Sequence, residues 1–181
     1  MNRRTRRRRA RLRRAALIAP FVLIGSGYLA GTRLPSLYVA QRRIVLRQSP
    51  EKVWRVLTDL DGMPTWRRDL STVERLPAPG GVVRWRELRE GASIALEIAE
   101  RVPPRRLVVR VADPSGTPQR RWVYQIRGTR TGREAEVTVR EERTVTNPLR
   151  RLLLRAFRLG GAELAGLCRD LEERMVLGRG S

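Results

Sequence analysis

The 181-residue chain contains no histidine and a single cysteine, Cys168. Without histidine there is no imidazole for general acid–base catalysis, for a Ser-His-Asp triad or for binding a metal ion. One cysteine excludes an intrachain disulfide and a thiolate-based metal site. We therefore expect no metal and no cofactor, and we interpret Cys168 as a small buried apolar residue on a helix.

Lysine is almost absent as well, because Lys52 is the only one and arginine supplies every other cation. The net charge is +21, and nine of the arginines lie within residues 1–14. Without these nine, 30 cations remain against 18 acidic residues, so residues 15–181 still carry a net charge of +12. Such a charge favours contact with anionic lipid, acidic ligands or nucleic acid.

Residues 15–32 carry no charge and are mostly apolar. Eighteen residues in a helix span about 27 Å, close to the thickness of about 30 Å of a hydrocarbon core. Pro20, Gly25 and Gly27 weaken such a helix, although membrane helices tolerate these residue types. The favoured interpretation is a transmembrane signal-anchor; the alternatives are a cleaved signal peptide and a buried or disordered tail.

Arginine is distributed unevenly around this segment, because nine arginines precede it and only sparse ones follow. The positive-inside rule then places residues 1–14 in the cytoplasm and the domain on the periplasmic or external side. We expect a single-pass membrane protein whose arginine-rich tail contacts anionic lipid headgroups. Residues 33–38 are interpreted as a short linker.

Local signals then predict a strand followed by two short helical segments. After a first strand at residues 39–47, Ser49-Pro50-Glu51 has the composition of a helix start, with an N-cap hydroxyl, a proline and an acid in the first turn. Apolar residues at helical spacing continue to Leu60, and Asp61-Gly62-Met63-Pro64 ends that helix. A second short helix or turn carries Trp66.

Alternating apolar and polar residues predict six further strands, separated by turns rich in proline and glycine. These strands are expected near residues 70–76, 82–89, 93–102, 107–111, 121–127 and 137–145. One polar face argues for an antiparallel sheet whose other face is covered. The cover is one long helix from Asn147-Pro148 to about Val176, which Gly160-Gly161 is able to kink.

The stretch Val53-Trp54…Asp59…Pro64-Thr65-Trp66…Val73-Glu74, set in this order of elements, resembles the START/Bet v1-like superfamily, also called SRPBCC or polyketide cyclase/dehydrase-like. The resemblance covers residues 39–176 and leaves residues 177–181 as a tail. It implies an α+β helix-grip fold, in which an antiparallel sheet of about six to seven strands wraps around a long C-terminal helix. Here a transmembrane helix is expected to precede that fold.

The resemblance further implies an apolar cavity between sheet and helix that takes a hydrophobic ligand. The residues expected to line it are Trp85, Leu96, Val109, Trp122, Tyr124 and Val139, with Trp66 near the mouth. The alternative is that the aromatic side chains simply fill the core. Tyr124 is the best candidate for a polar contact, because a buried phenol needs a partner.

Two carboxylates are expected to point toward the same space. Glu87 and Glu141 share strand parity with Trp85 and Val139. An inward carboxylate is a candidate general acid or base, but pairing with arginine near a strand end is the favoured interpretation. The sequence shows no paired-carboxylate spacing, nucleophile motif or phosphate loop.

The predicted function is membrane-anchored binding or transfer of a lipid, quinone or polyketide. One alternative is an enzyme of the cyclase/dehydrase type that uses Tyr124 or an inward carboxylate; another is an envelope interaction protein with a filled core and no ligand. Nucleic acid is a disfavoured partner, because acids interleave with the outward arginines of the strands and no recognised motif is present. An unpaired carboxylate facing a cavity would favour the enzyme.

Overall fold

The computed structural model describes residues 24–112, 120–130, 132–156 and 161–177. Two compact units divide the chain: residues 37–144 with 160–181, and residues 1–36 with 145–159. The larger unit contains β1 (Leu37–Leu46), α2 (Pro50–Thr58), η1 (Met63–Thr65), β2 (Thr72–Leu76), η2 (Pro79–Gly81), β3 (Arg84–Arg89), β4 (Ala92–Val102), β5 (Arg106–Val111), β6 (Arg120–Gly128), β7 (Ala135–Thr144) and α4 (Ala162–Leu177). The smaller unit contains a helix at residues 24–32 and α3 (Pro148–Ala156).

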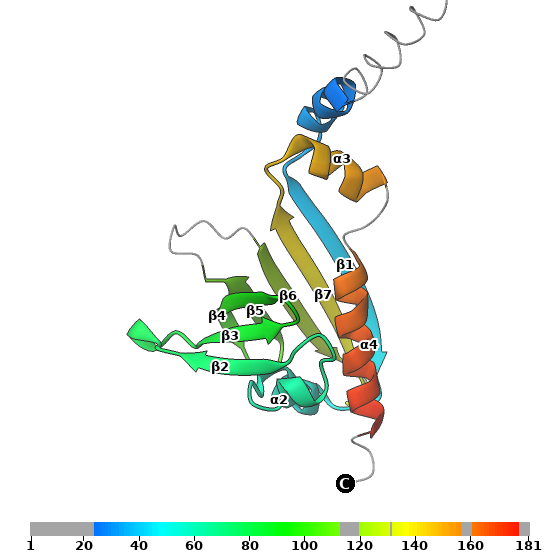
Figure 1. Ribbon diagram of the computed structural model, residues 1–181. Helices are drawn as coiled ribbons and strands as arrows, with labels where there is room; N and C mark the ends of the chain where they lie inside the picture. Colours follow the sequence, from blue (N-terminus) through cyan, green and yellow to red (C-terminus); the bar gives the residue numbers. More distant parts are fainter. Residues whose placement is uncertain (1–23, 113–119, 131, 157–160, 178–181) are drawn as a thin grey trace, which may run out of the picture. The chain divides into compact units, whose positions relative to one another are not determined.

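The seven strands of the larger unit form one antiparallel sheet in the order β1-β7-β6-β5-β4-β3-β2 (Figure 1). The first and last strands are therefore neighbours, and α4 packs against this pair. The short helix α2 lies by β6. The predicted α+β helix-grip fold with an antiparallel sheet is thus confirmed for this unit.

The local signals at Ser49 and along the strands explain why these elements form. The Ser49 hydroxyl accepts a hydrogen bond from the backbone N–H of Lys52 at 3.3 Å, which caps α2. In β6, Trp122 and Tyr124 are buried while Gln125 is exposed, as expected for a strand with one covered face. A bulge in β4 between Ile98 and Glu100 shifts the register there.

The outer face of the sheet carries arginines that are paired with acids. Buried Glu97 on β4 accepts hydrogen bonds from Arg84 Nε at 2.7 Å and Arg110 Nε at 2.6 Å. Burial raises the pKa of Glu97, but the two arginines lower it further, so the pKa lies below its usual value. Other outward arginines are paired in the same way, namely Arg86 with Glu74 and both Arg121 and Arg140 with Glu142. This interleaving of charges agrees with the sequence-based argument against a nucleic-acid surface.

The predicted C-terminal helix corresponds to two described segments, α3 and α4, which belong to different units. Residues 157–160, where the two segments would join, lie outside the described part, so the predicted continuity of the helix falls on residues that the structure does not describe. Cys168 is buried on α4 as predicted, and burial raises the pKa of its thiol to about 11.

The predicted linker at residues 33–38 is too long at its C-terminal end. Leu37 pairs with Thr144, so β1 already begins there. In the smaller unit, Gly31 approaches α3 so closely that an added Cβ would lie 2.1 Å from the carbonyl oxygen of Pro148.

The predicted membrane span falls only partly on described residues, since residues 15–23 lie outside them. Among the helices that are described, none is both long and apolar enough to cross a bilayer.

Packing of α4 on the sheet is testable at Leu171, which is fully buried in the core. Replacing Leu171 with alanine is expected to lower the free energy of unfolding by about 2–5 kcal/mol, because it leaves a cavity in that core. Val176→Ala on the same helix is the control, since the Val176 side chain is mostly exposed. Urea denaturation of both variants measures the difference, and equal stability of the two would contradict the packing.

Candidate ligand-binding site

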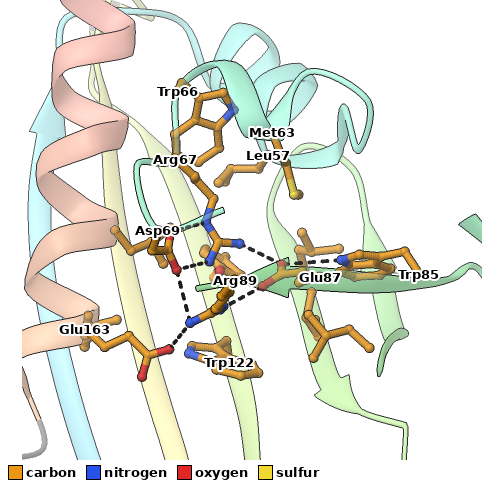
Figure 2. A pocket seen from close by; sticks show the side chains of 16 residues that line it. Leu57, Met63, Trp66, Arg67, Asp69, Trp85, Glu87, Arg89, Trp122 and Glu163 are labelled. Atoms are coloured by element: carbon orange, nitrogen blue, oxygen red, sulfur yellow. Dashed lines mark hydrogen bonds and ion pairs between the residues drawn. The ribbon is translucent and has the colours of Figure 1, made fainter. Parts of the chain in front are cut away.

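A cavity lies in the larger unit, bounded by the inner face of the sheet, the residues around η1 and the first turns of α4 (Figure 2). Its apolar lining consists of Leu57, Met63, Trp66, Trp85, Leu96, Leu107, Val109, Trp122, Tyr124, Leu164 and Leu167. The polar lining consists of Arg67, Asp69, Glu87, Arg89 and Glu163. The cavity volume is about 40 Å³, which suffices for about three water molecules.

This volume is far below the roughly 300–1,000 Å³ typical of sites for drug-sized ligands. In this conformation the aromatic side chains therefore fill most of the space that was expected to be open. A hydrophobic ligand larger than a few heavy atoms requires the cavity to widen.

Six of the seven residues predicted to bind a ligand line this cavity. Trp85, Leu96, Val109, Trp122 and Tyr124 come from β3, β4, β5 and β6, and Trp66 follows η1. The placement of Val139 on the cavity is wrong, because this residue is fully buried within the core cluster and does not line the cavity. The physical reason is that α4 packs against β1 and β7, so the inner face of β7 is filled.

A buried carboxylate, Glu87, sits on the polar side of the cavity (Figure 2). Its oxygens accept hydrogen bonds from Arg67 Nη1 at 2.7 Å and from Arg89 Nη2 at 2.7 Å. The indole N–H of Trp85 also donates to it, at 3.4 Å. Such pairing is required, because an ionised carboxylate removed from water is otherwise costly.

The ion pairs continue from Glu87 to the helix and to β7. Asp69 bridges the two arginines, with Oδ2 at 2.9 Å from Arg67 Nη2 and 3.1 Å from Arg89 Nη1. Arg89 Nη1 also contacts Glu163, in the first turn of α4, at 2.5 Å. Arg120 on β6 joins Glu163 to Glu141, which in turn binds Arg143. We call these eight residues the ionic network: Arg67, Asp69, Glu87, Arg89, Arg120, Glu141, Arg143 and Glu163.

Ion pairing and burial shift the pKa values of three groups that border the cavity, Arg67, Arg89 and Tyr124. Burial lowers the pKa of Arg67, but the charges of Glu87 and Asp69 raise it more, so the guanidinium keeps its proton. Arg89 likewise has a raised pKa despite burial, because of Glu87 and Glu163. Burial raises the pKa of Tyr124 well above its usual value, so its phenol is neutral at physiological pH and is no general base there.

The prediction that Glu87 and Glu141 point inward and pair with arginine is confirmed. Glu141 is fully buried and its Oε1 accepts from Arg120 Nε at 2.7 Å and Arg143 Nη2 at 2.5 Å. Its Oε2 has no hydrogen-bond partner within the described ranges, but Glu141 does not line the cavity.

Each described carboxylate that lines the cavity is paired with an arginine. An unpaired carboxylate facing the cavity would have favoured an enzyme. Because these carboxylates are paired, the arrangement favours binding over acid–base catalysis. No group of three acidic or cysteine side chains in the described ranges is placed to hold a metal ion.

Sequence reasoning missed the arginines of the cavity. A signal for Arg89 was present, because it shares strand parity with Trp85 and Glu87. Arg120 likewise shares parity with Trp122, and its guanidinium lies 4.5 Å from the centre of that ring. For Arg67 and Asp69 no periodic signal exists, because both lie in the irregular segment between η1 and β2.

The pairing of Glu87 is testable through stability. Glu87→Gln leaves the buried guanidinium of Arg67 and the half-buried one of Arg89 with less compensation, and we expect a loss of about 3–5 kcal/mol in the free energy of unfolding. Glu74→Gln on β2 is the control, because exposed Glu74 forms a surface ion pair worth only about 0–1 kcal/mol. Denaturant titration compares the two variants, and a Glu87 variant as stable as the control would disprove the role of this carboxylate.

The pH dependence of stability is testable at Glu163. Burial raises the pKa of Glu163, but Arg120 and Arg89 lower it more, so the folded value lies below the unfolded value of about 4.3. A lowered folded pKa gives stability that is complete above the unfolded pKa and is lost as the pH falls through the folded pKa. We expect the difference in thermal midpoint between the wild type and Glu163→Gln to shrink as the pH is lowered from neutrality through this range. A difference that does not depend on pH would contradict the assignment.

The chain matches a known protein family. The family described as polyketide cyclase / dehydrase and lipid transport matches residues 39–175. No curated protein matches the chain. Among solved structures, a protein of Thermus thermophilus is 18% identical with a TM-score of 0.61, covering 78% of this chain and 99% of its own.

Two further solved structures share the fold. A START superfamily protein from Mycobacterium smegmatis is 15% identical with a TM-score of 0.58, covering 77% of this chain and 97% of its own. The Zhui aromatase/cyclase from a Streptomyces species is 12% identical with a TM-score of 0.58, covering 77% of this chain and 93% of its own. Identities this low establish the fold alone. The family match covers most of the chain and therefore shows the family as well as the fold. This protein belongs to the polyketide cyclase / dehydrase and lipid transport family.

Proposed function

We propose that this protein binds or transfers a hydrophobic small molecule, such as a lipid, quinone or polyketide, in the cavity between its sheet and α4. The observation that carries the proposal is the apolar cavity with tryptophans 66, 85 and 122 in its wall. Large flat side chains of this kind stack on rings or line acyl chains. Membership of a family described by cyclisation, dehydration and lipid transport supports the same class of ligand.

Binding in this proposal includes a widening of the cavity. The first turn of α4 forms part of the wall through Glu163 and Leu164. Its polar tie to the sheet, through Arg89 and Arg120, involves a Glu163 side chain that is 36% exposed. Displacement of this turn would break the contacts of Glu163 with Arg89 and Arg120 and would enlarge the space.

We also propose that residues 15–32 anchor the protein in a membrane, with the domain on the extracytoplasmic side and the arginine-rich tail at anionic lipid. An uncharged run of this length and the arginine excess before it support the anchor. Hydrophobic ligands partition into bilayers, so an anchor would hold the cavity near its source of ligand. An enzymatic role has weaker support, because the carboxylates on the cavity are paired and the phenol of Tyr124 is protonated.

The cavity assignment is testable by filling the space. Val109→Phe on β5 adds more volume than the 40 Å³ cavity offers, and we expect the affinity for the neutral fluorophore N-phenyl-1-naphthylamine to fall by about tenfold or more. Val108→Phe is the matched control, because Val108 precedes it on the same strand and points to the opposite face. Fluorescence titration of both variants gives the affinities. Equal affinities in the two variants, or no binding to the wild type, would contradict the proposal.

The anchor is testable by placing a charge within the predicted span. Leu23→Arg is expected to weaken membrane insertion by roughly 2.5–3.5 kcal/mol on biological insertion scales. The wild-type chain should stay in the membrane pellet after alkaline carbonate extraction, and the variant should be released in larger part. A wild-type chain found wholly in the soluble fraction would disprove the anchor and leave the cavity proposal untouched.

A further inference from the structure

We infer that the cavity selects uncharged hydrophobic molecules that carry a hydrogen-bond acceptor, such as a carbonyl oxygen, and rejects those with an anionic or cationic head. The inference rests on the proposed function and narrows its ligand class. Two observations carry it: the charge balance of the ionic network, and a buried donor on Arg89, a residue of the cavity wall, that has no partner among the described residues.

The ionic network contains four arginines and four carboxylates in one connected set of ion pairs, so its formal charge is zero. A ligand carboxylate or phosphate at the cavity finds no cation of the ionic network that lacks a carboxylate partner, and a ligand ammonium finds no carboxylate that lacks an arginine. A charged head would therefore enter without a counter-charge or would break an existing ion pair, and both outcomes oppose its binding.

The unpaired donor is the Nε–H of Arg89. Arg89 lines the cavity, and its other nitrogens are occupied, Nη1 by Asp69 and Glu163 and Nη2 by Glu87. A buried N–H without an acceptor is unfavourable, so a neutral acceptor that reaches it gains a hydrogen bond without disturbing the ion pairs. A carbonyl oxygen accepts this hydrogen bond and leaves the ion pairs intact. A plain hydrocarbon also leaves the ion pairs intact, but it cannot accept the hydrogen bond.

Competition among ligands of equal chain length tests the selection. A straight-chain methyl ketone, the corresponding fatty acid, the corresponding primary amine and the alkane each displace N-phenyl-1-naphthylamine from the full-length wild type at neutral pH. We expect the ketone to bind about tenfold or more tightly than each of the other three. A fatty acid, amine or alkane that binds as tightly as the ketone would overturn the inference, while its displacement of the fluorophore would uphold the proposed function. If none of the four displaces the fluorophore, both fail.

Arg89→Lys tests the donor itself, because lysine keeps the positive charge and removes the Nε–H. We expect the ketone to lose its advantage over the alkane in this variant. Arg86→Lys is the matched control, since Arg86 lies on the same strand, faces outward and pairs with Glu74. The control should keep the ketone preference, and a preference that survives in Arg89→Lys as well would overturn the assignment of the donor.

Glu163→Gln tests the charge rule, because it leaves the ionic network with one excess positive charge. We expect the fatty acid to gain about tenfold in affinity relative to the ketone. Glu173→Gln on the same helix is the matched control, because Glu173 is exposed and pairs with Arg68 outside the ionic network. An unchanged ratio of fatty acid to ketone in Glu163→Gln would overturn the charge rule.

Discussion

The interaction on which the site depends is the burial of the Glu87 carboxylate between two arginines. Because a charge removed from water must be paired, the buried Glu87 carboxylate requires Arg67 and Arg89 to lie beside it. Through Arg67 it holds the irregular segment after η1 against the sheet, and through Arg89 and Glu163 it ties β3 to the first turn of α4. One carboxylate thereby connects three sides of the cavity, which explains why an arginine-rich chain tolerates so many charges on the apolar face of its sheet.

The same pairing shapes what the cavity is able to do. Because its arginines and carboxylates neutralise one another, the cavity offers no free base and no free charge, although it offers a tryptophan-rich apolar wall. The small volume in this conformation means that the site must widen for its ligand. With its ion pairs closed, the site recognises the ligand by shape and by neutral hydrogen bonding to the remaining donor, the Nε–H of Arg89. Catalysis by one of the cavity carboxylates would need its ion pair to open first.

Much of the fold could be predicted from the sequence because its signals are local. Alternation along the strands and the cap at Ser49 depend on neighbouring residues, and the same parity placed Glu87 and Glu141 inward. Other features depend on contacts between distant residues. The position of Arg67 is set by a carboxylate twenty residues away. Val139 is buried in the core although its strand parity matches that of cavity residues, and the cavity volume follows from packing that no sequence pattern encodes.

Native mass spectrometry of the full-length protein, extracted gently from cells, with organic extraction of the molecules that co-purify, tests most directly whether the cavity holds an uncharged hydrophobic molecule. We expect one neutral, carbonyl-bearing apolar molecule per chain. A protein whose mass shows no bound molecule, or whose bound molecule is a fatty acid or a phospholipid, would contradict it.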